Sequence, residues 1–285
     1  MKLVAIDLDG TLLSSECTIS DFNKKAIRDV QEQGNAIVIS SGRSLHDTKK
    51  ILKLADIDCP IISGNGAITC YSDKIIQQQT ISEAILSELI KLIEKMDVYY
   101  EVYTNEGIFI KGDRKDILND EIQNIQGDSA WAKDLVEIQY SQHNIHFVQN
   151  DLELTTSKME PYKVFVFSFD MMKLDTLKRI LSDRDDISIT TSGAQKLELG
   201  NNKASKGNAL LFLADYLGVS LKDTVAIGDN LNDVSMFEVA GISIAMENGE
   251  AAAKEKAHYI TKHCNNDGVG YALGKYVLEK SFSSN

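Results

Sequence analysis

Two aspartates near the start of the chain are the first residues whose types and spacing could do chemistry. Asp7 and Asp9 stand in the motif DLDGT, and the apolar run KLVAIDL predicts a buried strand that ends there. Open α/β sheets bind ligands at such strand ends. One carboxylate could attack a substrate or bind a metal while the other transfers a proton, and Gly10 allows the chain to turn sharply. A loop whose acids cap the next turn fits the same motif.

A second polar motif follows the next predicted strand, NAIVIS. Ser40, Ser41, Gly42 and Arg43 come directly before a predicted helix. Hydroxyl groups, a glycine and free backbone amides at a helix start can cradle a phosphate. A serine N-cap with a tight-turn glycine is the other interpretation of this motif.

Two further motifs lie in the last third of the chain. In GDNLND, Asp229 ends a predicted strand and Asp233 lies one helical turn later, so that both carboxylates could hold one divalent cation. Lys206 opens a predicted helix, where an ammonium opposes the helix dipole unless an anion lies nearby. A capped helix start and a solvated surface lysine are the alternatives at these two places.

These motifs require elements that bring them to one sheet edge. Strands and helices alternate at both ends of the chain, which predicts a doubly wound, mostly parallel α/β sheet. The expected helices of this sheet are 21–34, 45–54, 206–217 and 234–239. Between these ends, amphipathic helices and alternating strands predict an inserted α+β domain. We therefore expect a core from residues 1–80 and 192–285 and an insert from residues 81–191.

Composition and charge exclude several classes of function. The 285 residues include 30 Lys plus Arg and 42 Asp plus Glu, for a net charge of -12, which argues against nucleic-acid binding. A phosphate-handling site in such a chain needs local positive charge from lysine, helix ends or a metal. No apolar run is long enough for a membrane span, and the four cysteines form no CxxC pair. We expect a cytoplasmic protein without nucleic-acid or membrane partners, and no obligate protein partner is evident.

The four motifs, in this order, resemble those of the haloacid dehalogenase superfamily of phosphohydrolases. The insert between the second and third motifs and the segments NDVSMFEVAGISIAMENG and DGVGYAL resemble its Cof-type branch with a class IIB cap. The resemblance covers essentially the whole chain and implies a Rossmann-like core with an α+β cap that closes over the active site. One departure is LELGNNKASKG, which lacks the proline that the family often carries shortly before the motif-three lysine.

The resemblance also implies roles for individual residues. Asp7 would attack the phosphoryl group and become an aspartyl phosphate, while Asp9 would protonate the leaving oxygen and later activate water. Mg²⁺ would be held by Asp7, the backbone carbonyl of Asp9 and Asp229, with Asp233 nearby or acting through water. Thr11 would brace the loop. The phosphoryl oxygens would be bound by Leu8, Ser41, Gly42, Lys206 and Asn232.

The leading interpretation is a Mg²⁺-dependent phosphatase for a small phosphorylated metabolite, such as a sugar phosphate or a phosphorylated cofactor. The resembling transport ATPases have threonine in place of Asp9, so the acid here favours hydrolysis or mutase chemistry. A phosphomutase of the same fold and a phosphoaspartate signalling module are the alternatives, although receiver domains need only about half this length. The candidate substrate contacts are Asn65, which matches a family position, and Met159, Glu160 and Tyr162 in the insert.

Overall fold

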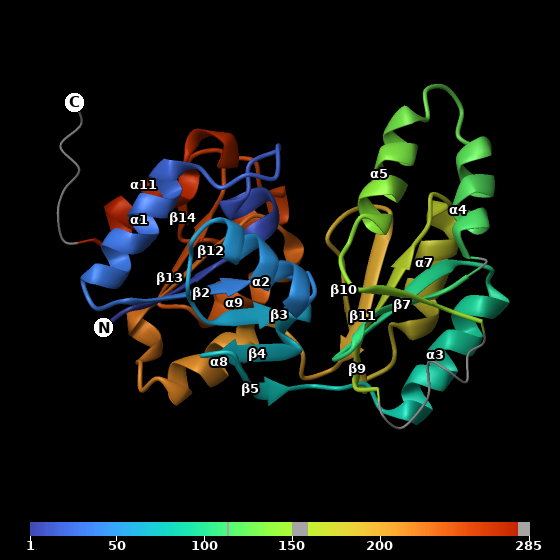
Figure 1. The fold of residues 1–285 in the computed structure, drawn as a ribbon, viewed down its shortest axis with the longest axis horizontal. Helices are drawn as coiled ribbons and strands as arrows, with labels where there is room; N and C mark the ends of the chain where they lie inside the picture. Colours follow the sequence, from blue (N-terminus) through green and yellow to red (C-terminus); the bar gives the residue numbers. More distant parts are fainter. Residues whose placement is uncertain (113, 150–158, 279–285) are drawn as a thin grey trace. The chain divides into compact units, whose positions relative to one another are not determined.

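A mostly parallel sheet, built from both ends of the chain, carries the sequence motifs. The computed structural model describes residues 1–112, 114–149 and 159–278. These residues divide into two compact units (Figure 1). The first comprises Met1–Gln78 and the described residues from Ala204 onward, and the second comprises Gln79–Lys203.

The sheet of the first unit has eight strands among the described residues, in the order β14-β13-β12-β1-β2-β3-β4-β5. The pairs from β14 to β3 are parallel, whereas β3–β4 and β4–β5 are antiparallel. Its strands are β1 (Leu3–Ile6), β2 (Ala36–Ser40), β3 (Ile61–Ser63), β4 (Ile68–Tyr71), β5 (Lys74–Gln78), β12 (Thr224–Gly228), β13 (Ile242–Ala245) and β14 (Tyr259–Ile260).

Helices cover both faces of this sheet, which buries its central strands β1, β2, β3 and β12 almost completely, whereas the outer strands β5 and β14 are partly or fully exposed. Alternate residues of β1 point to opposite cores: Val4 and Ile6 pack into one, Leu3 and Ala5 into the other. Figure 1 shows α1 and α11 on one side of the sheet and α8 on the other. The helices of this unit are α1 (Asp21–Glu32), α2 (Leu45–Leu54), α8 (Lys206–Tyr216), α9 (Val234–Val239), α10 (Ala251–Lys256) and α11 (Gly268–Tyr276).

Serine residues fix where three of these helices begin. The hydroxyls of Ser20, Ser44 and Ser205 each accept a hydrogen bond from the backbone amide three residues later, at the starts of α1, α2 and α8. The cap at Ser205 makes Lys206 the first residue of α8. The starts of α2 and α8 therefore lie next to the motifs that contain Ser41 and Lys206.

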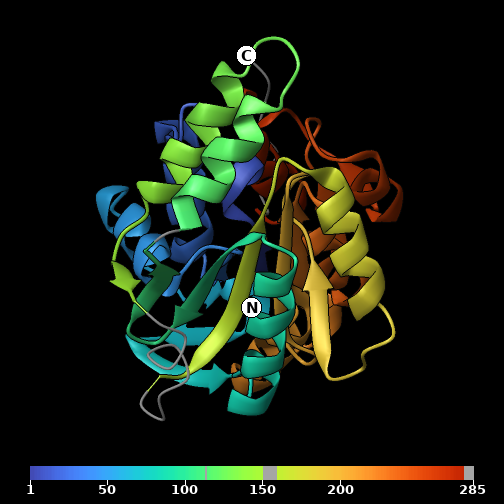
Figure 2. The same cartoon turned by 90° about the vertical axis from the view of Figure 1, so that its right-hand side faces the viewer.

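The second unit has its own six-stranded sheet within the described residues, in the order β10-β11-β9-β6-β7-β8. One face packs against α3 and α7, which Figure 2 shows over the side of the sheet turned toward the viewer. Its elements are α3 (Glu83–Lys95), β6 (Tyr99–Thr104), β7 (Gly107–Lys111), α4 (Arg114–Gln123), α5 (Ala130–Tyr140), β8 (Ile145–Val148), β9 (Pro161–Phe167), α7 (Met171–Leu181), β10 (Ile187–Thr190) and β11 (Lys196–Asn201).

The expected α/β class with an inserted α+β unit is confirmed. The units separate after Gln78 and after Lys203, whereas the sequence pattern placed the divisions after residues 80 and 191. Strand β11 lies in the second sheet because it pairs with β9 over Lys196–Gly200. No helix among the described residues combines the length and the apolar character needed to cross a bilayer.

Candidate active site

Three strands of the first sheet end side by side at the edge where the polar motifs lie. Ile6 of β1 is in register with Ile227 of β12 on one side and with Ile39 of β2 on the other. The residues that follow these positions therefore leave the sheet at the same level. The shared register brings together the motifs that contain Asp7, Ser41 and Asp229.

Lys206 links two of the aspartates. Its Nζ donates to Oδ1 of Asp7 at 2.5 Å and to Oδ1 of Asp233 at 2.6 Å. The Lys206 side chain is 0% exposed, and those of Asp7 and Asp233 are 7% and 0% exposed. A buried ammonium is costly unless it is paired, so the two carboxylates account for a lysine at this position. Lys206 is therefore not the solvated surface lysine that the sequence also allowed.

Burial and crowding of like charges shift the pKa values in this cluster. The pKa of Asp7 is raised well above its usual range by burial and by the charge of Asp233, although Lys206 acts in the opposite direction. Burial and the charge of Asp233 raise the pKa of Asp229 to about 6. Burial lowers the pKa of Lys206, but the carboxylates of Asp233 and Asp7 outweigh this effect, and the net shift is upward. Burial and the crowding of carboxyl groups beside a single ammonium thus disfavour the ionised forms of Asp7 and Asp229.

Asp233 also holds the loop that carries Asp229. Its Oδ2 accepts hydrogen bonds from the backbone amides of Asp229 at 2.8 Å and Asn230 at 3.0 Å. Gly228 is needed here, because a Cβ at that position would lie 2.4 Å from the Asp233 carboxylate. Asp233 therefore contacts two parts of the site at once: its Oδ2 binds the backbone of the loop, and its Oδ1 binds Lys206.

Thr11 and Gly10 shape the other side of Asp229. The hydroxyl of Thr11 donates to Oδ1 of Asp229 at 3.1 Å. Gly10 has φ +75, and a Cβ there would lie 2.4 Å from Oδ2 of Asp229. The first motif therefore packs directly against the GDNLND loop.

The three aspartates can hold a metal ion. One carboxylate oxygen from each of Asp7, Asp229 and Asp233 lies within 4.8 Å of the others. Carboxylate oxygens suit hard divalent cations such as Mg²⁺. Three acids against the single ammonium of Lys206 leave an excess of negative charge that such a cation would balance. The donor set fits a divalent metal.

The residues expected to bind phosphate lie in the neighbouring loops. Ser41 is fully buried and accepts a hydrogen bond from the Arg43 amide at 3.1 Å, and Leu8 is also buried. Gly42 lies between Ser41 and Arg43 and is partly exposed. The phosphate-binding roles of these residues stay predictions.

Asn65 and Asn232 form a direct pair across this region. The Nδ2 of Asn232 donates to Oδ1 of Asn65 at 3.1 Å. Asn65 has φ +57 and is buried, and its amide donates to the Ser41 carbonyl at 3.1 Å. Within the described part of the chain, the buried Oδ1 of Asn232 has no hydrogen-bond partner. The pair joins the GDNLND loop to the loop after β3.

Arg43 forms an ion pair that the sequence did not indicate. Its Nε donates to Oδ2 of Asp9 at 2.8 Å, and its Nη2 donates to Oδ1 at 2.7 Å. The hydrogen bond that Arg43 donates to Asp9 raises the pKa of Arg43 above its already high value. The position of Arg43 directly after Ser41 and Gly42 was the available signal, but Asp9 lies 34 positions earlier in the sequence, and local sequence patterns do not predict such a contact.

The candidate substrate contacts in the second unit have different environments. Met159 packs against the apolar core beneath α3 and α7, and Glu160 is exposed. Tyr162 is buried, and its ring stands edge-on to Tyr103. The structure therefore does not gather these three side chains on one surface.

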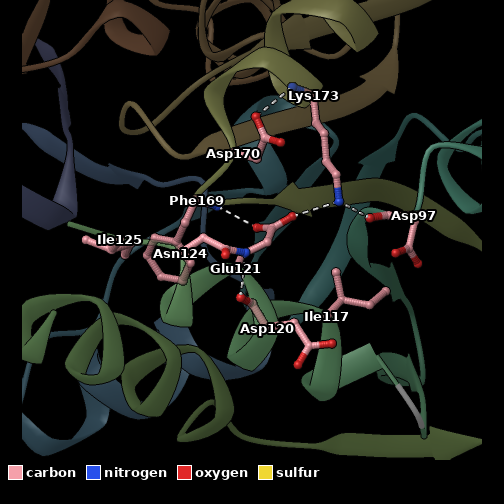
Figure 3. A pocket seen from close by; sticks show the side chains of 9 residues that line it. All are labelled: Asp97, Ile117, Asp120, Glu121, Asn124, Ile125, Phe169, Asp170 and Lys173. Atoms are coloured by element: carbon pink, nitrogen blue, oxygen red, sulfur yellow. Dashed lines mark hydrogen bonds and ion pairs between the residues drawn. The ribbon is translucent and has the colours of Figure 1, made fainter.

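The second unit contains a cavity of about 510 Å³, beside α4 and the start of α7. Figure 3 shows Lys173 reaching toward Glu121 and the backbone of Asp97, with hydrogen bonds of 3.0 and 2.6 Å. Glu121 also accepts from the amide of Phe169 at 2.8 Å. The lining contains none of the residues that the sequence singled out.

Fold and acidic cluster together correspond to one known class of hydrolase. A family model described as haloacid dehalogenase-like hydrolase matches residues 4–273, and the chain belongs to this family. The resemblance to its Cof-type branch is confirmed, and the protein is a phosphatase.

Its relatives match over nearly their full lengths. The chain is 37% identical to the 5-amino-6-(5-phospho-D-ribitylamino)uracil phosphatase YwtE of Bacillus subtilis, covering 97% of this chain and 98% of that protein. It is 33% identical to phosphatase YwpJ of the same organism, covering 98% and 100%. The solved structure of a haloacid dehalogenase-like hydrolase from B. subtilis superposes with a TM-score of 0.87 at 33% identity. The match covers 98% of this chain and 100% of that chain.

Proposed function

We propose that this phosphatase is Mg²⁺-dependent and hydrolyses a small phosphorylated metabolite through an aspartyl phosphate on Asp7. The observation that carries the proposal is the contact of Asp7 with Lys206, beside Asp229 and Asp233. A nucleophile for phosphoryl transfer needs positive charge nearby to accept an incoming anion. A bound Mg²⁺ ion would add the positive charge that Lys206 alone does not supply.

The first step transfers the phosphoryl group to the protein. An oxygen of the Asp7 carboxylate forms a bond to phosphorus while the bond from phosphorus to the leaving oxygen breaks. The carboxyl group of Asp9 gives its proton to that oxygen, and a neutral alcohol leaves. Lys206 and the loop amides hold the phosphoryl oxygens during this transfer.

The second step releases phosphate. The Asp9 carboxylate takes a proton from a water molecule, whose oxygen forms a bond to phosphorus while the bond to Asp7 breaks. Inorganic phosphate leaves, the Asp7 carboxylate is restored, and Asp9 again carries a proton. The two steps consume one water and one phosphate monoester and yield one alcohol and one phosphate.

The relatives suggest where to look for the substrate. YwtE and YcsE of Bacillus subtilis are both named 5-amino-6-(5-phospho-D-ribitylamino)uracil phosphatases. We propose a substrate of the same chemical class for the present protein. This class is a primary phosphate ester of a sugar or polyol chain, alone or attached to a cofactor precursor. The second unit would act as the cap that encloses the leaving group and excludes water.

A phosphate-release assay on the purified protein tests the proposal. The panel contains p-nitrophenyl phosphate, sugar phosphates and 5-amino-6-(5-phospho-D-ribitylamino)uracil, each with Mg²⁺ and with excess chelator. Release that requires Mg²⁺ and favours one polyol or sugar phosphate is expected. A folded protein that releases no phosphate from any ester contradicts the proposal, and conversion to an isomeric phosphate without release identifies a phosphomutase instead.

A further inference from the structure

The ion pair between Arg43 and Asp9 has the geometry of a clamp. Two nitrogens of the guanidinium reach the two oxygens of the same carboxylate, at 2.8 and 2.7 Å. This parallel arrangement fixes the direction of a carboxylate as well as its distance. The side chains are 31% exposed for Arg43 and 51% exposed for Asp9.

Both partners are attached to a fixed backbone. The amide of Arg43 donates to the Ser41 hydroxyl at 3.1 Å, and its carbonyl accepts from the Gly64 amide at 3.0 Å. After Asp9, the carbonyl of Gly10 accepts from Nδ2 of Asn248 at 2.7 Å. Because both backbones are held, the guanidinium determines where the Asp9 carboxylate points.

Stability alone does not account for this pair. Ion pairs at such exposure contribute little to the free energy of folding, and Arg43 loses side-chain freedom in forming one. A half-exposed aspartate without a partner samples several rotamers. A proton carrier must instead lie within hydrogen-bond reach of the atom it serves.

We propose that Arg43 is the positioning residue for Asp9: it holds the carboxylate that remains after proton transfer to the leaving oxygen in the direction needed to take a proton from the attacking water. This inference rests on the proposed function, in which Asp9 then activates water. Arg43 acts through Asp9 and makes no contact of its own with the substrate. A lysine cannot replace it fully, because an ammonium lacks the planar fork.

Separating the two steps tests this role. With p-nitrophenyl phosphate, the first turnover releases one p-nitrophenolate per protein before phosphate is released, and p-nitrophenolate leaves readily without a proton. Arg43→Ala should therefore keep this first burst but lower the steady-state kcat about 10- to 100-fold for both p-nitrophenyl phosphate and an alkyl phosphate, as part of the 10²–10⁴ that acid–base groups contribute. KM should not rise, and Arg43→Lys should be intermediate.

Two further variants complete the experiment. Arg184→Ala is the matched control, since Arg184 forms a similar two-nitrogen pair with Asp186, at 2.8 and 2.5 Å, in the second unit. It should leave both substrates unaffected. In an Asp9→Asn background, adding Arg43→Ala should cause no further loss, because Arg43 then has no carboxylate to position.

The possible results separate the two proposals. A wild-type protein without phosphatase activity on any ester overturns the proposed function and this inference together. An active wild type with an unchanged Arg43→Ala overturns this inference alone. A slower first burst, a raised KM, or an added loss in the Asp9→Asn background also overturns it, because each result indicates that Arg43 acts on the substrate or on the first step directly.

Discussion

The ammonium of Lys206 lies 2.5 Å from the carboxylate of Asp7, although the two residues are 199 positions apart in the sequence. Lys206 is the first residue of α8, where a cation opposes the helix dipole. The carboxylates of Asp7 and Asp233 compensate for this unfavourable position and for the loss of solvent. The contact couples the proposed nucleophile to the start of a helix, so removal of Lys206 should affect both activity and stability.

Lys206→Met should lower kcat by about 10²–10³, as expected when a charge-stabilising donor is lost. It should also reduce the free energy of unfolding by about 3–5 kcal/mol, because the Asp7 and Asp233 carboxylates remain buried without their partner. Phosphate release and denaturant unfolding measure the two effects. Lys24→Met, which removes an exposed pair with Asp21, should change neither by much. Full activity in Lys206→Met would contradict the role of the lysine.

Gly10→Ala should disable the site through its contact with Asp229. The new Cβ would lie 2.4 Å from Oδ2 of Asp229, at a residue with φ +75. Gly34→Ala is the matched control, since Gly34 has φ +76 but no atom within 4 Å of the place that a Cβ would take. Both variants should lose about 1–2 kcal/mol of stability from the left-handed backbone. Phosphatase assays should show a large loss for Gly10→Ala alone, and equal activities would argue against close packing at Asp229.

Thr11→Val should raise the Mg²⁺ concentration needed for half-maximal activity about 10- to 100-fold, as is typical when a partner of a metal ligand is removed. The reason is the hydrogen bond from the Thr11 hydroxyl to Oδ1 of Asp229. Thr11→Ser keeps that hydroxyl and should behave like the wild type. Activity measured across a Mg²⁺ series checks this, and identical curves for the valine and serine variants would exclude the effect.

The sequence was sufficient to predict that the acidic residues of this site lie together. Asp7 and Asp229 follow short apolar runs, and parallel strands end at a common edge, so their types and positions predict that they meet. The helices 45–54 and 234–239 were also predicted with the bounds found in α2 and α9. The regular alternation of strands and helices along the chain was sufficient for these elements.

The parts that escaped prediction depend on contacts between distant residues. The partner of Arg43 could not be predicted, since a surface arginine gives no sign of which carboxylate it will reach. The hairpin β4–β5 and strands β10 and β11 are short and partly polar, so their pairing is set by neighbouring strands and not by their own pattern. The roles assigned to the phosphate-binding residues stay predictions.

Glu101 should make the stability of the second unit depend on pH. This carboxylate is fully buried and accepts hydrogen bonds from the Tyr99 hydroxyl at 2.7 Å and from Gln139 at 2.9 Å. Burial raises its pKa, although these hydrogen bonds act in the opposite direction. Because the folded value is the higher one, its stabilising contribution is present below the unfolded pKa of about 4.3 and is lost as pH rises through the folded pKa.

The variant Glu101→Gln removes this titration. The Tm of the wild type relative to that of Glu101→Gln should therefore fall as the pH is raised from about 4 to about 8. Glu137→Gln, at an exposed position on α5, should show no such trend relative to the wild type. Thermal unfolding at several pH values makes the comparison, and a constant difference between wild type and Glu101→Gln would refute it.

Covalent trapping tests the central claim most directly. Asp9→Asn should still accept a phosphoryl group from p-nitrophenyl phosphate in the presence of Mg²⁺, but should release it slowly because no base activates water. Rapid quenching and mass spectrometry of the digested protein should then find one phosphoryl group on Asp7, which is absent from Asp9→Asn/Asp7→Asn. Phosphoryl transfer to another residue, or phosphate release by Asp7→Asn at the wild-type rate, would contradict the account.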